Sequence, residues 1–342
     1  MKRWILTKNA KSLENLILEE VPVPEPKMGE VRIKNYAVSL NYRDVVIVKG
    51  EKGMGISRDI IPCSDGAGEI DAVGEGVDNW KVGDKVVTQC FRGWKDGKIL
   101  SDMDLGLGSN DADGTLAEYF VVKSDQIIAT PETLSYAEAA TLPCAGITAW
   151  SALYGNRPYL FPLQKEEKVL LLGTGGVTTL AIGIAVSAGA EVYCTTSQDN
   201  KVETLKTMGV KEIINYKTYE NWGEIIFEKT GGVDLVVNTV GLASMDQCIK
   251  ALNMGGRMSM VGAVDDTSGI FSESLLMMRK NNILFGVLAG SSAAFSDYSK
   301  FIDDNKIKPL IQQNYEFENA REAYEAAFSS HIFGKIVITI RH

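Results

Sequence analysis

The chain has 342 residues, of which 45% are hydrophobic and 23% are charged, and its formal net charge is −9. This length exceeds what one hydrophobic core usually serves, so two domains are expected. The acidic excess argues against a nucleic-acid partner, because phosphate binding needs a cationic face. Near the N-terminus the apolar run Trp4 to Leu6 is too short for the core of a signal peptide, and we expect a cytoplasmic protein.

The cysteines and histidines limit the possible metal and redox chemistry. No two cysteines are spaced two to four residues apart, which favours reduced thiols over a disulfide frame. Only two histidines are available as zinc ligands. The cysteines are Cys63, Cys90, Cys144, Cys194 and Cys248, and the histidines are His331 and His342.

Short alternating runs before residue 130 predict a compact, mostly β domain, and turns such as Gly74-Glu75-Gly76 separate them. The predicted strands are Val31 to Leu40, Gly68 to Val73, Lys85 to Thr88 and Ala117 to Val122. The segment from Trp94 to Ser109, rich in Asp and Gly, follows no such pattern. It is read as a solvated loop, with a lobe that tunes substrate access as the alternative.

The stretch from Val169 to Ser197 has no charged residue between Lys168 and Glu191, and it is long enough to cross a bilayer. Glycines divide it after a short aliphatic run, however, and small and aliphatic residues follow at helical spacing. A buried strand, a tight turn and a buried helix therefore fit better than a membrane span. The run Glu191 to Thr196 reads as a second strand, which completes a βαβ unit.

The glycines of this unit lie where a dinucleotide pyrophosphate would bind. Without a Cβ they allow a tight turn and a close approach of backbone amides at the positive end of the helix. Thr178 takes the last glycine position of the usual GxGxxG pattern, so the motif alone is weak and a plain glycine-rich turn stays open. The predicted contacts are Gly173, Thr174, Gly175, Gly176 and Val177.

Four further strand-like runs alternate with helical segments such as Lys201 to Met208 and Ser244 to Leu252, which predicts an α/β doubly wound parallel sheet. The strands are Ile213 to Tyr216, Val233 to Asn238, Arg257 to Gly262 and Ile283 to Val287. A nucleotide should lie across their carboxyl ends, near Thr196, Asn238, Thr239, Val240, Val261, Gly262 and Ala263. The last strand, Lys335 to Ile340, is expected to return to the first domain.

Charge favours NADP(H) over NAD(H). An acidic residue about 20 positions after the glycines would bind the ribose hydroxyls of NAD, but Thr196 and Ser197 stand there. Lys201 and Tyr216 could join these hydroxyls around a 2′-phosphate. Asp199 would soften that preference, and a solvated helix lysine is the plainer interpretation of Lys201.

Several segments together resemble the medium-chain dehydrogenase/reductase superfamily. They are LNYRDVVIVKG, IIPCSDGAGEIDAVGEGVDNWKVGDKVV, DGTLAEYFVV, LPCAGITAW, VLLLGTGGV, GGVDLVVNTVG and FGKIVITI. The resemblance implies a GroES-like β domain formed by both chain ends (1–130 and 290–342), a Rossmann NADP(H)-binding domain (131–289) and an active site in the cleft between them. It also implies a homodimer or homotetramer built through the edge of the Rossmann sheet.

The positions that hold catalytic zinc in the zinc-dependent alcohol dehydrogenases of this superfamily are altered. They carry Asn41 for a cysteine and Ser64 for the histidine of a GHE segment, and only Cys144 keeps a ligand type. One thiolate without partners does not hold zinc, so we expect no metal. Plain alcohol oxidation becomes less favourable without a Lewis acid.

What remains looks like the zinc-independent quinone oxidoreductase branch. This implies hydride delivery from NADPH to a quinone or to the β-carbon of an enone, with hydrogen-bond donors aimed at the substrate oxygen. We assign the donor role to Asn41 and Tyr42, with Arg43 as a further candidate, and the proton to Tyr42 or water. Asp44 and Asp65 would orient neighbouring groups. Each residue also has a purely structural interpretation. Asn41 would cap a turn, Tyr42 would pack its ring against neighbours, and Asp65 would accept hydrogen bonds from backbone amides.

The resemblance also places Thr148 near the nicotinamide and Asn238 beside a ribose or the adenine, while Phe333, Gly334 and Lys335 close over the cofactor. A surface charge beside a strand is the plainer interpretation of Lys335.

Two other functions stay open: a zinc-free oxidoreductase acting on alcohols or aldehydes, and an NADPH-binding sensor or structural protein without catalysis. The second stays open because a fold does not fix a reaction.

Overall fold

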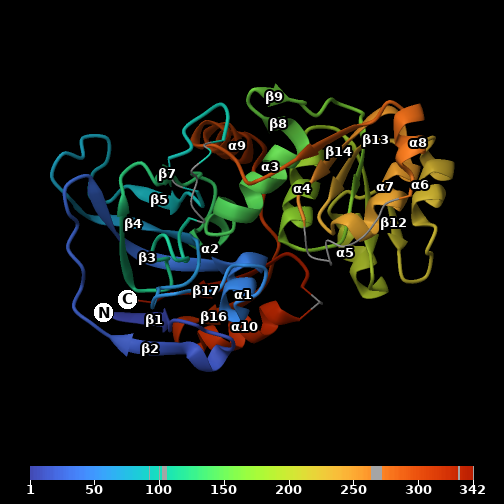
Figure 1. Ribbon diagram of the computed structural model, residues 1–342. Coiled ribbons are helices and arrows are strands. Elements are labelled where there is room, and N and C mark those ends of the chain that lie inside the picture. Colours follow the sequence, from blue (N-terminus) through green and yellow to red (C-terminus); the bar gives the residue numbers. More distant parts are fainter. Residues whose placement is uncertain (92, 100, 102–105, 263–271, 330–331, 342) are drawn as a thin grey trace. The chain divides into compact units, whose positions relative to one another are not determined.

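A computed structural model describes the whole chain except residues 92, 100, 102–105, 263–271, 330–331 and 342 (Figure 1). The chain forms two compact units, one of Met1–Ile147 with Ser291–His342 and one of Thr148–Gly290. Segment 131–147, placed in the Rossmann domain on sequence, lies in the first unit. There the short helix α2 (Tyr136–Ala139) packs on that unit's strands.

The first unit is built on a seven-stranded sheet with the order β16-β17-β3-β4-β5-β7, in which β6 also pairs with β3. Both ends of the chain contribute, because β17 pairs antiparallel with β3, with Ile336 opposite Leu40. The predicted return of the chain is confirmed. The strands are β3 (Glu30–Leu40), β4 (Asp65–Val73), β5 (Lys85–Thr88), β6 (Tyr119–Lys123), β7 (Ile127–Ala129), β16 (Ile311–Glu316) and β17 (Lys335–Thr339).

A large buried cluster joins the two chain ends inside this unit. Trp4, on the hairpin strand β1 (Lys2–Leu6) that pairs with β2 (Leu16–Glu20), donates its indole N–H to the carbonyl of Phe317 at 2.9 Å. Tyr324 of α10 (Ala320–Phe328) is fully buried in the same cluster. The remaining helices are α1 (Tyr42–Lys49) and α9 (Ser292–Asn305), while α3 (Ile147–Tyr154) leads into the second unit.

The second unit holds a six-stranded parallel sheet with the order β12-β11-β10-β13-β14-β15. This is the 3-2-1-4-5-6 order of the doubly wound dinucleotide-binding fold, so the predicted fold class is confirmed. The strands are β10 (Lys168–Leu171), β11 (Glu191–Thr196), β12 (Glu212–Asn215), β13 (Val233–Asn238), β14 (Leu252–Met260) and β15 (Ile283–Gly286). The helices are α4 (Gly176–Ser187), α5 (Val202–Thr207), α6 (Trp222–Thr230), α7 (Met245–Ala251) and α8 (Ser274–Arg279), and the short strands β8 (Gly155–Asn156) and β9 (Tyr159–Leu160) form a separate hairpin.

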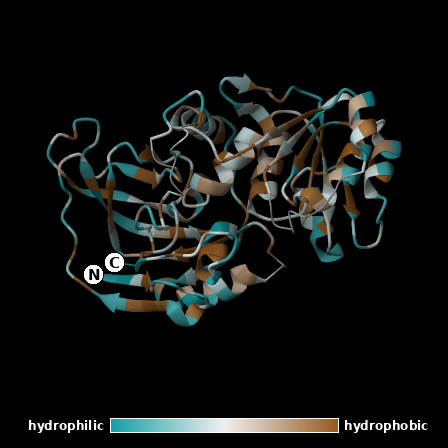
Figure 2. Ribbon diagram, in the orientation of Figure 1, coloured by the Kyte–Doolittle hydropathy of each residue, from teal (hydrophilic) through white to brown (hydrophobic). Residues whose placement is uncertain are grey.

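The apolar stretch around the glycines is the centre of this sheet. Val169, Leu170 and Leu171 of β10 are fully buried, as expected for a strand covered on both faces, and Leu180, Ile182 and Ile184 of α4 are buried as well. The strands between the helices are correspondingly hydrophobic in Figure 2. Within the described parts of the chain, every helix is too short or too polar to span a bilayer.

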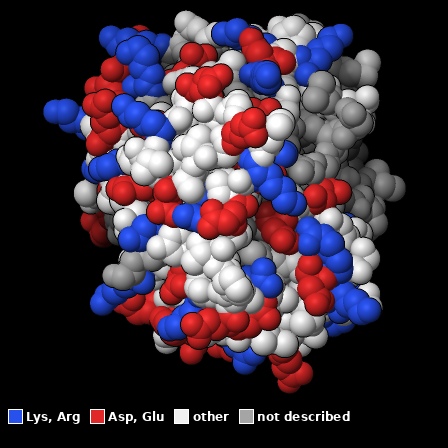
Figure 3. All heavy atoms as spheres, turned by 90° about the vertical axis from the view of Figure 1, so that its left-hand side faces the viewer, with Lys and Arg blue, Asp and Glu red and all other residues white. Residues whose placement is uncertain are grey.

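The surface carries charges of both signs. On the face shown in Figure 3, acidic and basic side chains are interspersed. Several form exposed pairs, such as Lys123 with Glu30 at 3.0 Å and Lys2 with Glu318 at 2.8 Å. Exposed pairs of this kind contribute little to stability.

Candidate active site and cofactor-binding turn

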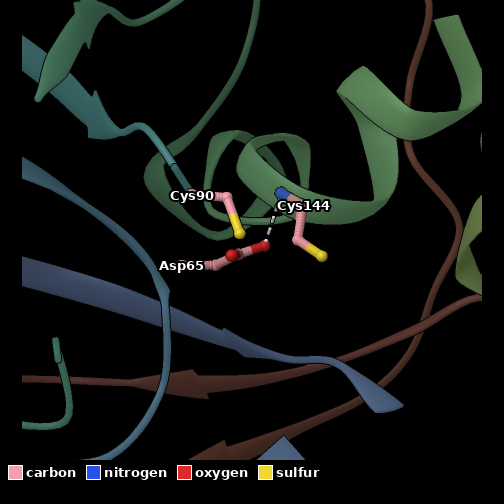
Figure 4. A group of neighbouring side chains, drawn as sticks. All are labelled: Asp65, Cys90 and Cys144. Atoms are coloured by element: carbon pink, nitrogen blue, oxygen red, sulfur yellow. Dashed lines mark hydrogen bonds between the residues drawn. The ribbon is translucent and has the colours of Figure 1, made fainter. Parts of the chain in front are cut away.

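Two thiols and a carboxylate meet inside the first unit (Figure 4). Asp65 opens β4, Cys90 follows the end of β5, and Cys144 lies in the π-helical turn Leu142–Gly146. One ligand atom from each lies within 4.8 Å of the others. The first two are neighbours because β4 and β5 pair antiparallel, and the backbone N–H of Cys144 donates to Asp65 Oδ2 at 3.0 Å.

Burial and hydrogen bonding set the protonation of this cluster. Burial raises the pKa of Asp65, while the Lys335 ammonium and a hydrogen bond from Ser64 oppose that rise. The hydrogen bond with Cys144 lowers the pKa of Cys90, and the same bond raises the pKa of Cys144 well above its usual value. Cys90 is therefore the more acidic thiol of the pair.

The first turn of α1 borders this cluster. The backbone N–H of Asn41 donates to Asp44 Oδ2 at 2.8 Å, which closes the start of the helix. The Asn41 side chain accepts a hydrogen bond from the Lys335 ammonium, and its amide lowers the pKa of Asp65. Asn41 and Asp65, both predicted as site residues, are thus brought together.

The other three predicted catalytic residues form the first turn of α1. Arg43 is largely buried, donates to the carbonyl of Leu107 at 2.8 Å and lies 3.7 Å from Asp44 Oδ1. Asp44 is fully buried. Tyr42 is 49% exposed and the Lys52 ammonium lies over its ring, so the interpretation of Tyr42 as a packed ring does not hold.

Burial raises the pKa of Asp44 from 3.8 to about 6, with Arg43 opposing, and Oδ1 of this carboxyl has no hydrogen-bond partner among the described residues. A folded-state pKa above the unfolded one means that ionisation disfavours folding. The Asp44 contribution to stability is therefore greatest below pH 4 and falls as pH rises toward 6. Asp44→Asn cannot ionise, so it should not show this loss. Its free energy of unfolding relative to wild type should therefore rise by on the order of 2 kcal/mol from pH 4 to pH 8. Urea unfolding of both proteins at the two pH values measures it, and an equal change in both would exclude the assignment.

The glycine-rich turn of the second unit has the geometry expected for a pyrophosphate site. Gly173 has φ of +71°, which favours glycine, and Gly175 precedes α4 with open space where a Cβ would stand. Thr178, in the third glycine position, is buried and donates its hydroxyl to the carbonyl of Leu172 at 2.7 Å. That bond accounts for threonine where the pattern has glycine.

Lys201 lies beside this turn. It is only 6% exposed, and its ammonium donates to the Thr174 hydroxyl at 2.9 Å. Burial lowers the pKa of Lys201, which means that its charge is poorly solvated. The solvated-lysine interpretation is therefore wrong. Asp199, the residue expected to soften the NADP(H) preference, accepts a hydrogen bond from the Asn215 side chain at 2.8 Å.

Thr196, Ser197 and Tyr216 surround the carboxyl end of β11. Thr196 is buried, and its hydroxyl oxygen accepts from the backbone N–H of Gln198 at 3.2 Å. The backbone N–H of Tyr216 donates to the carbonyl of Thr196, and the Tyr216 side chain is exposed. The three residues predicted to bind a 2′-phosphate thus lie at the carboxyl end of β11. Their contacts with the cofactor stay a prediction.

The loop after β13 is organised by Asn238. This side chain is fully buried, accepts from the N–H groups of Val240 and Gly241, and donates to the carbonyl of Gly241. Its bonds to oxygen and nitrogen atoms go into its own loop, so it shapes that loop, and its Nδ2 also contacts the sulfur atoms of Met245 and Met258. At Gly262 a Cβ would lie 1.8 Å from the carbonyl oxygen of Thr239, which explains the glycine. Of the other predicted residues, Thr239 donates its hydroxyl to the carbonyl of Leu172. Val240 and Val261 are half-buried, and Ala263 lies outside the described residues.

The remaining predicted cofactor residues divide between the two units. Thr148 belongs to the second unit and is largely buried. Phe333, Gly334 and Lys335 belong to the first, where the Phe333 N–H donates to Gln312 and Gly334 has φ of +85°. The side chain of Lys335 turns into the polar cluster of that unit.

Comparison with known proteins identifies the family. A zinc-type alcohol dehydrogenase-like protein of Schizosaccharomyces pombe is 34% identical over 344 residues, which cover 99% of both chains. The chain belongs to the medium-chain dehydrogenase/reductase superfamily. Family models match residues 27–132 as an alcohol dehydrogenase GroES-like domain and 176–304 as a zinc-binding dehydrogenase.

Other members of this superfamily share the whole length. A crystal structure of a putative alcohol dehydrogenase from Sinorhizobium meliloti 1021 superposes with a TM-score of 0.88 at 32% identity and 99% coverage of both chains. Acryloyl-coenzyme A reductase of Sulfurisphaera tokodaii is 29% identical over 94% of this chain and 95% of its own. A chloroplast envelope quinone oxidoreductase homolog of Arabidopsis thaliana is also 29% identical, over 93% of this chain and 92% of its own.

The matching family is described as zinc-binding, but the residues at its ligand positions have other partners in this chain. Asn41 accepts from the Lys335 ammonium, and Ser64 donates to Asp65 at 2.6 Å, so both family ligand positions are engaged. The expectation that Cys144 stands alone is wrong, because Cys90 and Asp65 lie beside it. However, Lys335 and Arg43 already direct positive charge at these donors. The residues do not fit the family's zinc site.

Proposed function

We propose that this dehydrogenase uses NADPH to reduce a quinone or an activated alkene without a metal ion. The observation that carries the proposal is the buried Lys201 ammonium beside the glycine-rich turn, since NADPH alone offers that position a 2′-phosphate. The cofactor would be held by Gly173 to Val177, with Thr196, Ser197, Lys201 and Tyr216 at its adenosine end.

The polar cluster supports the metal-free part of the proposal. When bound, the cofactor supplies a hydride, and reduction of an enone at the β-carbon leaves negative charge on the substrate oxygen. A hydrogen-bond donor aimed at that oxygen stabilises the charge. The Asn41 amide N–H groups are the proposed donors, with Asp65 fixing the amide, and the α-carbon then takes a proton from Tyr42 or water.

Two relatives agree with this substrate class. One is named a reductase of acryloyl-coenzyme A, which is an activated alkene, and one a quinone oxidoreductase homolog. Identities of 29% support the proposal without deciding between a quinone and an alkene.

A panel of acceptors tests the proposed reaction. Chelator-treated protein of measured zinc content is mixed with NADPH and a quinone, an enone or an aldehyde, and NADPH consumption is followed. We expect consumption with the quinone or the enone at zinc contents far below one per chain. Preference for the aldehyde together with stoichiometric zinc would contradict the proposal. Tight NADPH binding with no turnover would favour a non-catalytic binding protein.

The second unit also presents an edge strand suited to self-association. Ile283 and Leu284 of β15 are 45% and 41% exposed, and an exposed apolar edge invites pairing with another chain. We propose that the chain forms a homodimer through this edge. Sedimentation velocity, which compares the oligomeric state of wild type with that of Leu284→Glu, tests this proposal. A cytoplasmic location stays a prediction.

A further inference from the structure

A buried ammonium lies at the centre of the first unit. Lys335 begins β17 and is only 3% exposed. Its Nζ donates to the backbone carbonyl of Leu40 at 2.7 Å and to Asn41 Oδ1. The backbone is held as well, because the Lys335 N–H donates to the carbonyl of Leu310 at 2.9 Å. The side chain is thus directed into the polar cluster by its own strand.

This contact determines how the Asn41 amide is oriented. An ammonium only donates, so the oxygen of the amide has to face it and the NH₂ group has to face away. The Asn41 amide lies near enough to Asp65 to lower the pKa of that carboxyl. The contact of Nδ2 with the carbonyl of Ser39 measures 3.5 Å, the limit of a hydrogen bond. Lys335 therefore leaves Asn41 with a weakly held N–H that could donate to a substrate oxygen.

The charges of the cluster balance without a metal ion. Arg43 and Lys335 supply two positive charges, and Asp44 and Asp65 supply two negative ones. Lys335 acts on both carboxyls, where it opposes the rise in pKa that burial causes. A divalent ion at Asp65, Cys90 and Cys144 would have to be placed against both cations.

We propose that Lys335 is a positioning residue of the active site, whose ammonium orients Asn41 and serves as the resident cation where zinc-dependent relatives hold a metal. The part concerning substrate rests on the proposed function. This role replaces the cofactor contact expected for Lys335 on sequence, since its ammonium is bonded to Leu40 and Asn41.

Nuclear magnetic resonance tests the orientation without any activity. The side-chain NH₂ signal of Asn41, assigned by its loss in Asn41→Asp, should be shifted and slow to exchange with water in wild type. It should collapse toward that of a solvated asparagine in Lys335→Met and be largely restored in Lys335→Arg. Lys300→Met, which removes an exposed lysine of α9, is the control and should leave the signal unchanged. An Asn41 signal unaltered in Lys335→Met overturns the proposal.

Kinetics and calorimetry separate positioning from cofactor binding. Lys335→Met should lower kcat about 100-fold, the scale of one lost transition-state hydrogen bond, while the Kd for NADPH stays within about twofold. Asn41→Ala should cause a similar loss, and the double variant should be no worse than either single one. A large rise in the NADPH Kd with unchanged kcat would return Lys335 to the cofactor site.

Cobalt titration covers the competing interpretation. Binding of one Co²⁺ per wild-type chain, with thiolate charge-transfer bands that vanish in Cys90→Ala and Cys144→Ala, would make a metal the resident cation and overturn the proposal. If no acceptor is reduced, the proposed function fails, while the Asn41 signal and the cobalt titration still decide the role of Lys335.

Discussion

Gly175→Ala should weaken binding of NADPH and NADH alike, by about 100-fold or ~3 kcal/mol, while leaving the fold intact. Gly175 has φ of −76°, which alanine adopts freely, and a Cβ there would meet no atom of the described residues within 4 Å. The folded chain can therefore accept the methyl group. A pyrophosphate packed on the backbone of this turn cannot, because the methyl group would hold it away from the amides at the start of α4.

The control for this variant is Gly55→Ala in the first unit. A Cβ at Gly55 meets only atoms at 3.9 Å, and no cofactor contact is assigned there. Both variants should keep the wild-type Tm, and calorimetry should show a loss of affinity in Gly175→Ala alone. Wild-type affinity in Gly175→Ala would place the pyrophosphate somewhere other than this turn.

Lys201→Ala should weaken NADPH selectively, by roughly 1.5 to 3 kcal/mol, while the affinity for NADH changes little. The reason is that its buried ammonium would bond the 2′-phosphate, which NADH lacks. The ammonium is held at the turn by the Thr174 hydroxyl at 2.9 Å, so little ordering is needed on binding. The ratio of the two affinities, measured by calorimetry at one fixed salt concentration, is the informative quantity.

Lys206→Ala provides the matched control, because this lysine lies on α5, the helix that Lys201 caps, with its side chain 56% exposed. It should leave the ratio unchanged. Lys201→Arg, which keeps the charge, should retain much of the preference for NADPH. An unchanged ratio in Lys201→Ala would end the assignment of Lys201 to the phosphate.

The sequence was sufficient for the fold because its signals are local. The aliphatic run at β10, the glycines after it and the regular alternation of strands and helices predicted the doubly wound sheet, and β11 and β13 have the predicted bounds. Other strands begin or end at residues different from those predicted, because their backbone hydrogen bonding extends past the apolar run. At β14, for example, the strand begins at Leu252, because pairing with Val233 starts before the predicted residue Arg257.

The polar cluster was predicted only in part because it depends on contacts between distant segments. Nothing local in Thr88-Gln89-Cys90 indicates that the thiol of Cys90 lies beside Cys144. The available signal was the pairing of β4 with β5, which brings Asp65 and Cys90 together. Likewise, the burial of Lys335 follows from the antiparallel pairing of β17 with β3, made across 295 residues of sequence, so a surface charge seemed equally reasonable.

The most direct test of the central claim is the fate of a labelled hydride in metal-free protein. Chelator-treated wild-type chain is given NADPH deuterated at C4 and an enone, and the product is examined by mass spectrometry and NMR. Metal-free hydride transfer predicts one deuterium, on the β-carbon of the saturated product, at a rate that added zinc does not raise. Product without deuterium at that carbon, or turnover that appears only after zinc is restored, would contradict it.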